Sequence, residues 1–268
     1  MRYSDLVKKE QDLTALQWRE CLAVPGTSGS FLKATSGLGT GTVYYKASSF
    51  DEFNGFFGHE CVNELIASRL MGILGVSHAK YSLINARIRL NDIEYVTWIS
   101  ACPSYRRSFE TKQAFAQFFR QSAKKGESPL QLCDRLGWGD FVRQMMLIDY
   151  LIINQDRHGS NVEVLHGKDG RKRLSPVFDC GNSLVFSCYD VEASIRGFNP
   201  LIDAIGTNFI GSKRLAENLA VIPQGIVTPL REEHREVLFA GLNDVLPDYH
   251  LDKIWDIIWK RWCIYANL

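Results

Sequence analysis

The sequence predicts an α+β protein whose first part, residues 1–102, is rich in strands and whose second part, residues 103–268, is rich in helices. Up to about residue 100, glycines separate short runs of residues that favour strands. From Thr111 onward, long stretches repeat apolar residues at helical spacing. The two patterns meet at CPSYRRS, residues 102–108. With 268 residues, 46% of them apolar, the chain can bury the core of one large domain or of two lobes.

Four strands and one helix are expected in the first part. The runs 30–34 and 42–47 predict a hairpin, because glycines border these short strand-like segments. The stretch HECVNELIASRLMGILGV predicts a helix that stops at Gly75, since glycine readily ends a helix. Two further strands are expected at 79–84 and 93–99.

The second part is expected to contain four long helices. In the last of them, Trp255, Trp259 and Trp262 form a stripe that predicts core packing and not a cofactor site. Residues 189–228 are mixed in character and are not assigned to an element. The four helical stretches are TKQAFAQFFRQSA, DFVRQMMLIDYLIIN, PLREEHREVLFAGLNDVL and LDKIWDIIWKRWCIYA.

Composition and charge argue against several classes of function. The 31 Lys and Arg against 30 Asp and Glu give a formal charge of +1, so no overall field favours nucleic acid or an anionic membrane. The N-terminal stretch MRYSDLVKKEQDL lacks an apolar signal core, and no window approaches the roughly 18 apolar residues of a membrane span. The 7 cysteines are dispersed, which is typical of reduced thiols. We therefore expect a cytoplasmic protein that binds neither membranes nor, directly, nucleic acid.

A polar segment, NQDRHGSN, directly follows the apolar stretch that ends near residue 153. Asp156 and Asn161 lie in this segment, and Asp179 follows in LSPVFDCGNSL. Two short strands, 162–165 and 174–178, are expected between them, joined by the turn HGKDGRK, and would bring the three side chains to one edge. Phosphoryl transfer needs such a set: one carboxylate orients the attacking hydroxyl, while an Asn and a second carboxylate hold Mg²⁺.

The first part of the chain supplies a matching set of charges. Lys46 lies in the expected strand VYYKAS, and a lysine there is costly unless an anion pairs with it. Glu64, 18 residues later on the expected helix, is the natural partner; Glu60, one turn earlier, is the weaker alternative. The loop GTSGS before the hairpin could present backbone N–H groups to a phosphate.

Together these fragments resemble the HipA-like serine/threonine kinases, especially their short, CtkA-type members. The resemblance rests on GTSGSFLKA, YYKAS, VNELIASRLMGILG, NQDRHGSN and SPVFDCGNSL, and covers roughly residues 20–190. It implies a bilobal protein-kinase-like fold, with ATP and Mg²⁺ between an N-terminal lobe (1–102) and a helical C-terminal lobe (103–268). Position by position, it implies that Lys46 binds ATP phosphates, Glu64 orients Lys46, Asp156 is the catalytic base, and Asn161 and Asp179 bind the metal.

The resemblance also assigns roles to the catalytic loop and the phosphate loop. His158 matches the family's histidine in the catalytic loop, where it is expected to fix the loop and not to carry a proton. The family phosphorylates a serine in its phosphate loop, and Ser28 is the first candidate here. The resemblance further implies a protein substrate and allows an antitoxin or regulatory protein as partner. The residues expected at the phosphates of ATP are Gly26, Thr27, Ser28, Gly29 and Ser30.

Other interpretations stay open at this point. Phosphatidylinositol-type lipid kinases and small-molecule kinases use a similar D-R-H-x-x-N loop, and a pseudokinase would keep the fold without turnover. Asp156 and Asn161 alone could cap a turn, and Lys46 alone could be an edge-strand charge. Arg157 could form a local salt bridge or contact a phosphorylated side chain. The remaining histidines show no spacing typical of a metal site and are expected at the surface or satisfied in the core; they are His59, His78, His166, His234 and His250.

Overall fold

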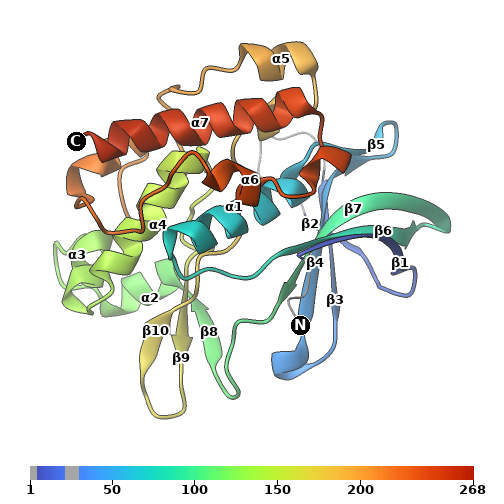
Figure 1. Cartoon of the computed structure of the whole chain (residues 1–268). Coiled ribbons are helices and arrows are strands. Elements are labelled where there is room, and N and C mark those ends of the chain that lie inside the picture. Colours follow the sequence, from blue (N-terminus) through green and yellow to red (C-terminus); the bar gives the residue numbers. More distant parts are fainter. Residues whose placement is uncertain (1–4, 22–29) are drawn as a thin grey trace.

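A seven-stranded sheet forms the N-terminal part of the chain in the computed structural model, which describes residues 5–21 and 30–268 (Figure 1). Within the described residues its strands run in the order β1-β6-β7-β4-β3-β2, with β5 paired to β4. The strands β1 and β6 are parallel, and the other neighbours are antiparallel. The strands are β1 (Leu6–Asp12), β2 (Arg19–Cys21), β3 (Ser30–Ser36), β4 (Val43–Asp51), β5 (Gly55–Phe57), β6 (Ser82–Leu90) and β7 (Ile93–Pro103).

The predicted hairpin is confirmed as β3 and β4, which pair antiparallel along most of their length. This pairing places Lys46 in the interior of the sheet, opposite Lys33 of β3 on one side and Ser100 of β7 on the other. The sequence does not predict β1, because LVKKEQD is mostly charged and only Leu6 of it is buried. It forms as an edge strand because β6 offers it a free row of backbone hydrogen bonds.

The helix α1 (Glu60–Leu74) carries Glu64 and contacts both parts of the chain. Almost all of its side chains are buried, because it contacts β4, β6 and β7 as well as α4 (Gly139–Ile152) and α6 (His234–Leu238). It ends as predicted at Gly75, whose φ of 75° is the left-handed conformation that glycine adopts without strain.

Helices form most of the C-terminal part. The helix α4 ends just before the polar segment NQDRHGSN, and α7 (Asp248–Ala266) packs against α4 and α5 (Glu192–Gly197). The long helix α7 runs across one side of the molecule in Figure 1. The remaining elements here are α2 (Phe115–Ser122), α3 (Pro129–Arg135) and the short 3-10 helices η2 (Phe186–Cys188), η3 (Leu215–Val221) and η4 (Leu242–Asp244); η1 (Gly39–Gly41) lies between β3 and β4.

The predicted helix at 111–123 is wrong at its start. Thr111–Ala114 form the strand β8, which pairs with β9 (Glu163–His166); β9 also pairs with β10 (Lys172–Leu174). The backbone of β8 satisfies the open edge of β9, and this tertiary pairing outweighs the weak helical preference of TKQA. The helix α2 then begins at Phe115, whose side chain is fully buried.

Other element boundaries also differ from the prediction, among them the strand expected at 79–84, which is β6 at Ser82–Leu90. The stretch 229–246 is not one helix: α6 and η4 are separated by Gly241, whose φ of 74° cannot continue a right-handed helix. The strand expected at 174–178 ends at Leu174, because the chain then leaves the β9–β10 ladder and Val177 forms a bridge with His78.

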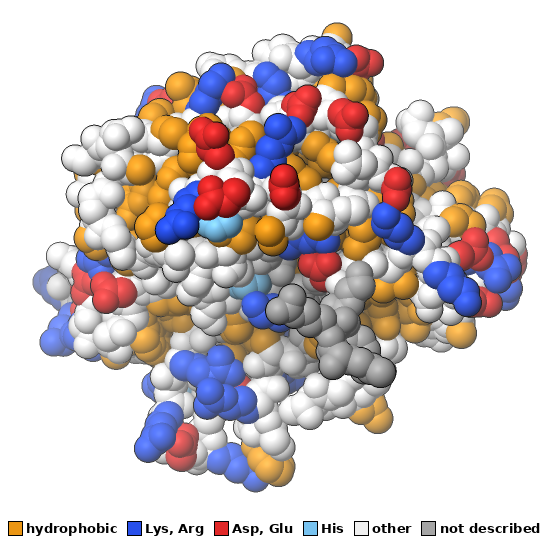
Figure 2. All heavy atoms as spheres, viewed as in Figure 1, with side chains coloured by type: hydrophobic (Ala, Val, Ile, Leu, Met, Phe, Trp, Pro, Cys, Tyr) orange, Lys and Arg blue, Asp and Glu red, His pale blue; other side chains and the backbone are white. Residues whose placement is uncertain are grey.

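The main hydrophobic core surrounds α1, α4 and α7, and a smaller cluster lies in the sheet around Ile88 and Ile99. Trp262 is buried in the main core, while Trp255 and Trp259 stack on each other and pack against it, as the stripe predicts. In the part of the chain that the structure describes, no helix combines the length and apolar character needed to cross a bilayer. Figure 2 shows acidic and basic side chains mixed over the upper part of the molecule and mainly Lys and Arg over the lower part, where β8, β9 and β10 lie.

Candidate active site

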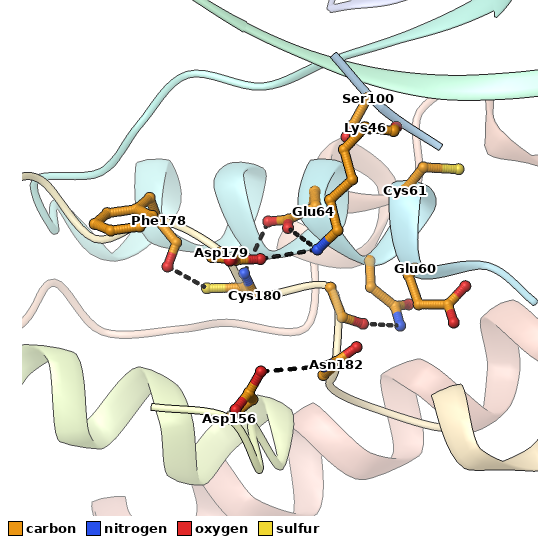
Figure 3. Close-up of polar contacts among 12 residues, drawn as sticks. Lys46, Glu60, Cys61, Glu64, Ser100, Asp156, Phe178, Asp179, Cys180 and Asn182 are labelled. Atoms are coloured by element: carbon orange, nitrogen blue, oxygen red, sulfur yellow. Dashed lines mark hydrogen bonds and ion pairs between the residues drawn. The ribbon is translucent and has the colours of Figure 1, made fainter. Parts of the chain in front are cut away.

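Three charged side chains from distant segments meet beside the sheet (Figure 3). Lys46 extends from β4, and its Nζ lies 2.8 Å from Oδ1 of Asp179 and 3.5 Å from Oε1 of Glu64 on α1. Glu60 is occupied elsewhere: its Oε1 accepts a hydrogen bond from the hydroxyl of Ser49 at 2.6 Å. Glu64 and not Glu60 is therefore the glutamate that contacts Lys46.

Burial and the neighbouring charges together set the protonation of this group. Burial disfavours the charge of Lys46, but the carboxylates of Asp179 and Glu64 outweigh that effect and raise the pKa of its ammonium group. Burial also works against the charge of Asp179, but Lys46 and Lys33 outweigh it and hold the pKa of this carboxyl well below its ordinary value. For Glu64, burial outweighs the opposing Lys46 and raises the pKa. Lys46 and Asp179 are therefore held as an ion pair.

The segment FDCGNS is fastened to α1 by hydrogen bonds. The second carboxylate oxygen of Glu64 accepts a hydrogen bond from the backbone N–H of Cys180 at 2.8 Å. The side-chain amide of Asn63 donates to the carbonyls of Gly181 and Ser183 at 3.0 and 2.9 Å. A Cβ atom on Gly181 would lie 3.1 Å from a backbone oxygen of α1, so only glycine allows this approach without displacement. The motif and the helix thus position each other.

Arg157 is almost completely buried beneath the polar segment. Its guanidinium group pairs with Asp149 of α4 at 2.9 Å and donates to the carbonyls of Asn161 at 3.1 Å and Phe178 at 2.6 Å. One side chain therefore joins α4, the segment NQDRHGSN and the residue that precedes Asp179. Of the two roles left open by the sequence, the structure shows the local salt bridge.

Asp156 projects from the same segment, and two side chains donate hydrogen bonds to its carboxylate. The amide of Asn182 lies 3.2 Å from Oδ2, and the hydroxyl of Thr207 lies 3.3 Å from Oδ1 (Figure 3 shows the first). Nε2 of His158 is 3.8 Å from Oδ1, beyond hydrogen-bonding distance. The backbone carbonyl of Asp156 accepts a hydrogen bond from the side-chain amide of Asn161 at 2.8 Å.

His158 and Asn161 contribute to the loop in different ways. Nδ1 of His158 accepts a hydrogen bond from the backbone N–H of Ser160 at 3.2 Å, a contact that shapes the loop. The amide nitrogen of Asn161 donates a hydrogen bond to the backbone carbonyl of Asp156. This orientation leaves the amide oxygen available as a ligand atom for a cation. Together with the carboxylate of Asp179 it would provide the hard oxygen atoms that Mg²⁺ prefers, so the residues present fit that metal.

A cavity of about 300 Å³ opens beside Lys46 and Asp179. Its wall is largely apolar and aromatic, with Ala34 and Tyr44 from the sheet and Phe178 from the segment before Asp179. Cavities of this size and character hold small organic ligands. The remaining lining residues include Lys33, Tyr81, Ser100, Cys102, Tyr105 and Glu163.

The predicted site residues form two groups that adjoin through the motif FDCGNS. Lys46, Glu64 and Asp179 meet directly; Asp156, His158 and Asn161 share the loop after α4. Asn182, three residues after Asp179, contacts Asp156 and so connects the groups. Of the predicted phosphate loop, Gly26, Thr27, Ser28 and Gly29 lie outside the described residues, and Ser30 is the first residue of β3.

The sequence interpretation misses several residues that shape this site. Asn182 and Asn63 could have been suspected, because Asn182 lies three residues after Asp179 in the same motif and Asn63 directly precedes Glu64. Nothing in the sequence around Thr207 indicates a role in the site. This residue lies in the unassigned stretch 189–228 and reaches Asp156 only because the chain folds back on itself. Tyr81, whose hydroxyl accepts a hydrogen bond from the backbone N–H of Asp179 at 3.2 Å, likewise has no motif around it.

The fold is similar to that of a known kinase. The crystal structure of the proinflammatory kinase CtkA from Helicobacter pylori matches with a TM-score of 0.61 and 14% sequence identity, covering 96% of this chain and 96% of that chain. At this identity the likeness concerns the fold. It confirms the predicted α+β, kinase-like architecture and the predicted structural resemblance to CtkA.

Two further solved structures are less similar. One contains the toxin–antitoxin proteins HipA and HipB of Shewanella oneidensis MR-1 with operator DNA; the match has a TM-score of 0.38, 15% identity and covers 84% of this chain and 60% of that chain. The other is a complex of PAN2 with the pseudokinase and C-terminal parts of PAN3 from Neurospora crassa, with a TM-score of 0.31, 7% identity and coverage of 97% and 65%. TM-scores this low add nothing to the argument. No protein-family model and no curated protein matches the sequence.

Proposed function

We propose that the protein is a kinase that transfers the γ-phosphoryl group of ATP to a Ser or Thr hydroxyl of a protein. The observation that carries this proposal is the shared contact of Lys46 with Glu64 and Asp179 at the edge of a ligand-sized cavity. Kinases need this combination of a strand lysine, a helix glutamate and a metal-binding aspartate to hold the phosphates of ATP. The nucleotide would lie between an N-terminal lobe, residues 1–102, and a C-terminal lobe, residues 103–268.

Each residue has a defined task in this proposal. Lys46 turns from Asp179 to the phosphate oxygens when nucleotide binds, while Glu64 keeps its orientation. Asn161 and Asp179 would hold Mg²⁺, which when bound neutralises phosphate charge. The adenine ring would lie in the apolar part of the cavity, which Ala34 and Phe178 line.

Asp156 acts on the acceptor. The oxygen of the acceptor hydroxyl forms a bond to the γ-phosphorus, and the bond from that phosphorus to the β–γ bridging oxygen breaks. ADP leaves with the electron pair, and Asp156 takes up the proton of the hydroxyl. Asn182 and Thr207 keep the carboxylate in place through their hydrogen bonds. His158 supports the loop through its contact with Ser160.

The nature of the acceptor separates this proposal from a lipid or small-molecule kinase and from a pseudokinase. The formal charge of +1 gives no overall field that would favour an anionic membrane, which supports a protein acceptor. The retained set of Lys46, Glu64, Asp156, Asn161 and Asp179 favours turnover. A cytoplasmic location and an antitoxin or regulatory partner are further parts of the proposal, and the dispersed cysteines support the former.

The acceptor is identified by incubating the protein and γ-labelled ATP with a mixture of generic proteins, with phosphatidylinositol vesicles, or alone. We expect label on Ser or Thr of protein, found by phosphoamino-acid analysis. Label in lipid, or in no acceptor, would contradict the proposal.

The sample without added acceptor also tests the prediction for Ser28, where a phosphate would repel the phosphates of ATP. Absence of label from residues 27–30 of the active protein, or equal label there in Asp156→Asn, would exclude autophosphorylation in this loop.

A further inference from the structure

Two buried histidines and an aspartate converge outside the proposed nucleotide site. His59 directly precedes α1, Asp190 follows η2 in the segment after FDCGNS, and His250 lies in the first turn of α7. Both imidazole rings are only 1% exposed. Nδ1 of His59 lies 3.0 Å from Oδ1 of Asp190, and Nε2 of His59 lies 3.3 Å from Nε2 of His250. Three segments that are far apart in the sequence thus bring their donor atoms together.

The contact with Asp190 fixes the tautomer of His59. A carboxylate can only accept a hydrogen bond, so Nδ1 of His59 must carry the hydrogen atom that lies between them. In a neutral ring, Nε2 of His59 is then a bare lone pair. Nε2 of His59 lies 3.3 Å from Nε2 of His250, and the two rings pack edge-to-face with their centroids 4.2 Å apart. Only one proton or one cation can lie between the two nitrogens, and the rings must turn toward each other to share a cation.

The distance between the two nitrogens suits a metal ion. Zn²⁺ binds imidazole nitrogen at about 2.0–2.1 Å in tetrahedral geometry, which places two such ligands roughly 3.3–3.4 Å apart. The observed separation is 3.3 Å. One ligand atom from each of His59, Asp190 and His250 lies within 4.8 Å of the other two. Metal-binding histidines typically donate their second N–H to a carboxylate, as His59 does to Asp190.

The three groups lie beside a cavity, and Asp190 is the one of them that solvent reaches. They line a cavity of about 230 Å³, and none of its lining residues also lines the cavity beside Lys46 among the residues that the structure describes. The side chain of Asp190 is 45% exposed, so an ion has a route from solvent past the carboxylate. Water molecules in this cavity could complete the coordination of a metal held by two protein nitrogens.

We propose that Nε2 of His59 and Nε2 of His250 bind a Zn²⁺ ion, with Asp190 holding the ring of His59 in the binding orientation. Imidazole nitrogens favour Zn²⁺ over Mg²⁺ and Ca²⁺, which prefer oxygen ligands. The ion fastens the start of α1 to α7 and, through Asp190, to the segment after FDCGNS. Asp190 already supports this junction, because its second carboxylate oxygen accepts a hydrogen bond from the backbone N–H of Gly58 at 2.8 Å.

The site is also placed to stabilise the proposed active site. Glu64 lies on α1 little more than one turn after His59, and its carboxylate holds both Lys46 and the backbone of Cys180. An ion that binds the folded chain and not the unfolded chain stabilises it by an amount that rises with the logarithm of the ion concentration over its dissociation constant, and so raises the temperature of unfolding. Zn²⁺ should therefore stabilise the protein, and Mg²⁺ at the same concentration should not do so through this site.

The test is equilibrium dialysis of the metal-free, full-length protein against Zn²⁺ in excess Mg²⁺ at neutral pH, without nucleotide. We expect one Zn²⁺ per chain in the unaltered protein and none in His250→Ala. The control His234→Ala should keep the ion, because among the described contacts the ring of His234 only accepts a hydrogen bond from the backbone of Arg231. Circular dichroism verifies that each variant is folded. Absence of bound Zn²⁺ in the unaltered protein, or equal binding by His250→Ala, would overturn the proposal.

A second variant keeps the test valid if His250→Ala fails to fold. Asp190→Asn keeps one side-chain oxygen, which can replace only one of the two carboxylate oxygens that accept from His59 and Gly58, and it lacks the charge that strengthens the ligand. Circular dichroism verifies that this variant is folded. Loss of such a supporting carboxylate lowers metal affinity by roughly 10–100-fold. An unchanged affinity for Zn²⁺ in Asp190→Asn would contradict the role of this residue. None of these measurements depends on kinase activity.

Discussion

Lys46 and Asp179 are 133 residues apart in the sequence, yet they form a direct ion pair with Nζ 2.8 Å from Oδ1. In the proposed function, Lys46 would hold the phosphates and Asp179 would hold Mg²⁺. Before the nucleotide arrives, these two side chains neutralise each other's charge. Binding of the nucleotide then exchanges one set of charge contacts for another, and no buried charge is left without a partner. This relationship makes the stability of the site and its activity depend on the same residues.

Replacing Lys46 should therefore destabilise the fold. In Lys46→Met, Glu64 and Asp179 lose the cation they share. Breaking a fully buried ion pair typically costs about 3–5 kcal/mol in the free energy of unfolding, and because the side chain of Asp179 is 27% exposed, the loss here should lie at or below the lower end of that range. The double variant Lys46→Met/Glu64→Gln removes one of the two like charges and should regain part of this loss. Urea unfolding measures both effects.

The control for this experiment is Lys8→Met, because the ion pair of Lys8 with Asp244 is exposed and should contribute less than about 1 kcal/mol. If the free energy of unfolding lost in the double variant equals the sum of the losses in the two single variants, Lys46 does not balance the charge of Glu64. The electrostatic account of the site would then be wrong.

Asp156→Asn should lower phosphoryl transfer by roughly 10²–10⁴-fold, the usual contribution of a general base. The amide can still accept a hydrogen bond from Asn182 or Thr207, so the fold and the affinity for ATP should be retained. Initial rates and nucleotide titration separate these effects. Asp169→Asn, in the exposed turn between β9 and β10, is the matched control and should behave like the unaltered protein. A loss below tenfold in Asp156→Asn would require a different base.

Gly181→Ala tests whether the motif FDCGNS and α1 must touch. The added methyl group would lie 3.1 Å from the backbone oxygen of Glu60 and 3.3 Å from Oε1 of Glu64, so one of the two segments must shift. We expect a loss of about 1–3 kcal/mol in stability, as for other overpacked sites, together with weaker binding of Mg·ATP. Gly197→Ala has nothing within 4 Å of the new atom and serves as control. Equal behaviour of the two variants would show that the contact is dispensable.

Buried cysteines should resist alkylation. Burial raises the pKa of the thiols of Cys61, Cys102, Cys133 and Cys180 to about 12. Because only the thiolate reacts, little of each is reactive at neutral pH, and labelling by iodoacetamide should increase only as the pH rises toward that value or when the chain unfolds. Cys263 is less buried and should be labelled first among these five. Mass spectrometry of labelled peptides gives the order, and rapid labelling of Cys180 in the folded protein would contradict its burial.

Much of the candidate site could be predicted because its residues lie in elements that have clear local sequence patterns. The Lys46 strand, the Glu64 helix and its stop at Gly75 follow from glycine placement and apolar periodicity, which reflect backbone physics at short range. The order of Lys46, Glu64, Asp156 and Asp179 then indicates one site, because kinases use those residue types in that order.

The parts that could not be predicted depend on contacts between distant segments. Thr111–Ala114 become a strand only because β9 presents a free edge, and nothing in TKQA itself indicates this. Thr207 reaches Asp156 from a stretch without periodicity. His59 and His250 are 191 residues apart and meet only when α7 packs near the start of α1, so their spacing in the sequence carries no metal signature.

The central claim is that this set of residues transfers the γ-phosphoryl group of ATP. The most direct measurement compares γ-labelled with α-labelled ATP in the presence and absence of Mg²⁺, using the unaltered protein, Asp156→Asn and Asp179→Ala. We predict that label enters Ser or Thr of protein only from γ-labelled ATP and only with Mg²⁺. The unaltered protein should transfer label rapidly, and both variants should transfer it far more slowly. Transfer that persists in Asp179→Ala, or equal labelling from α-labelled ATP, would contradict the account.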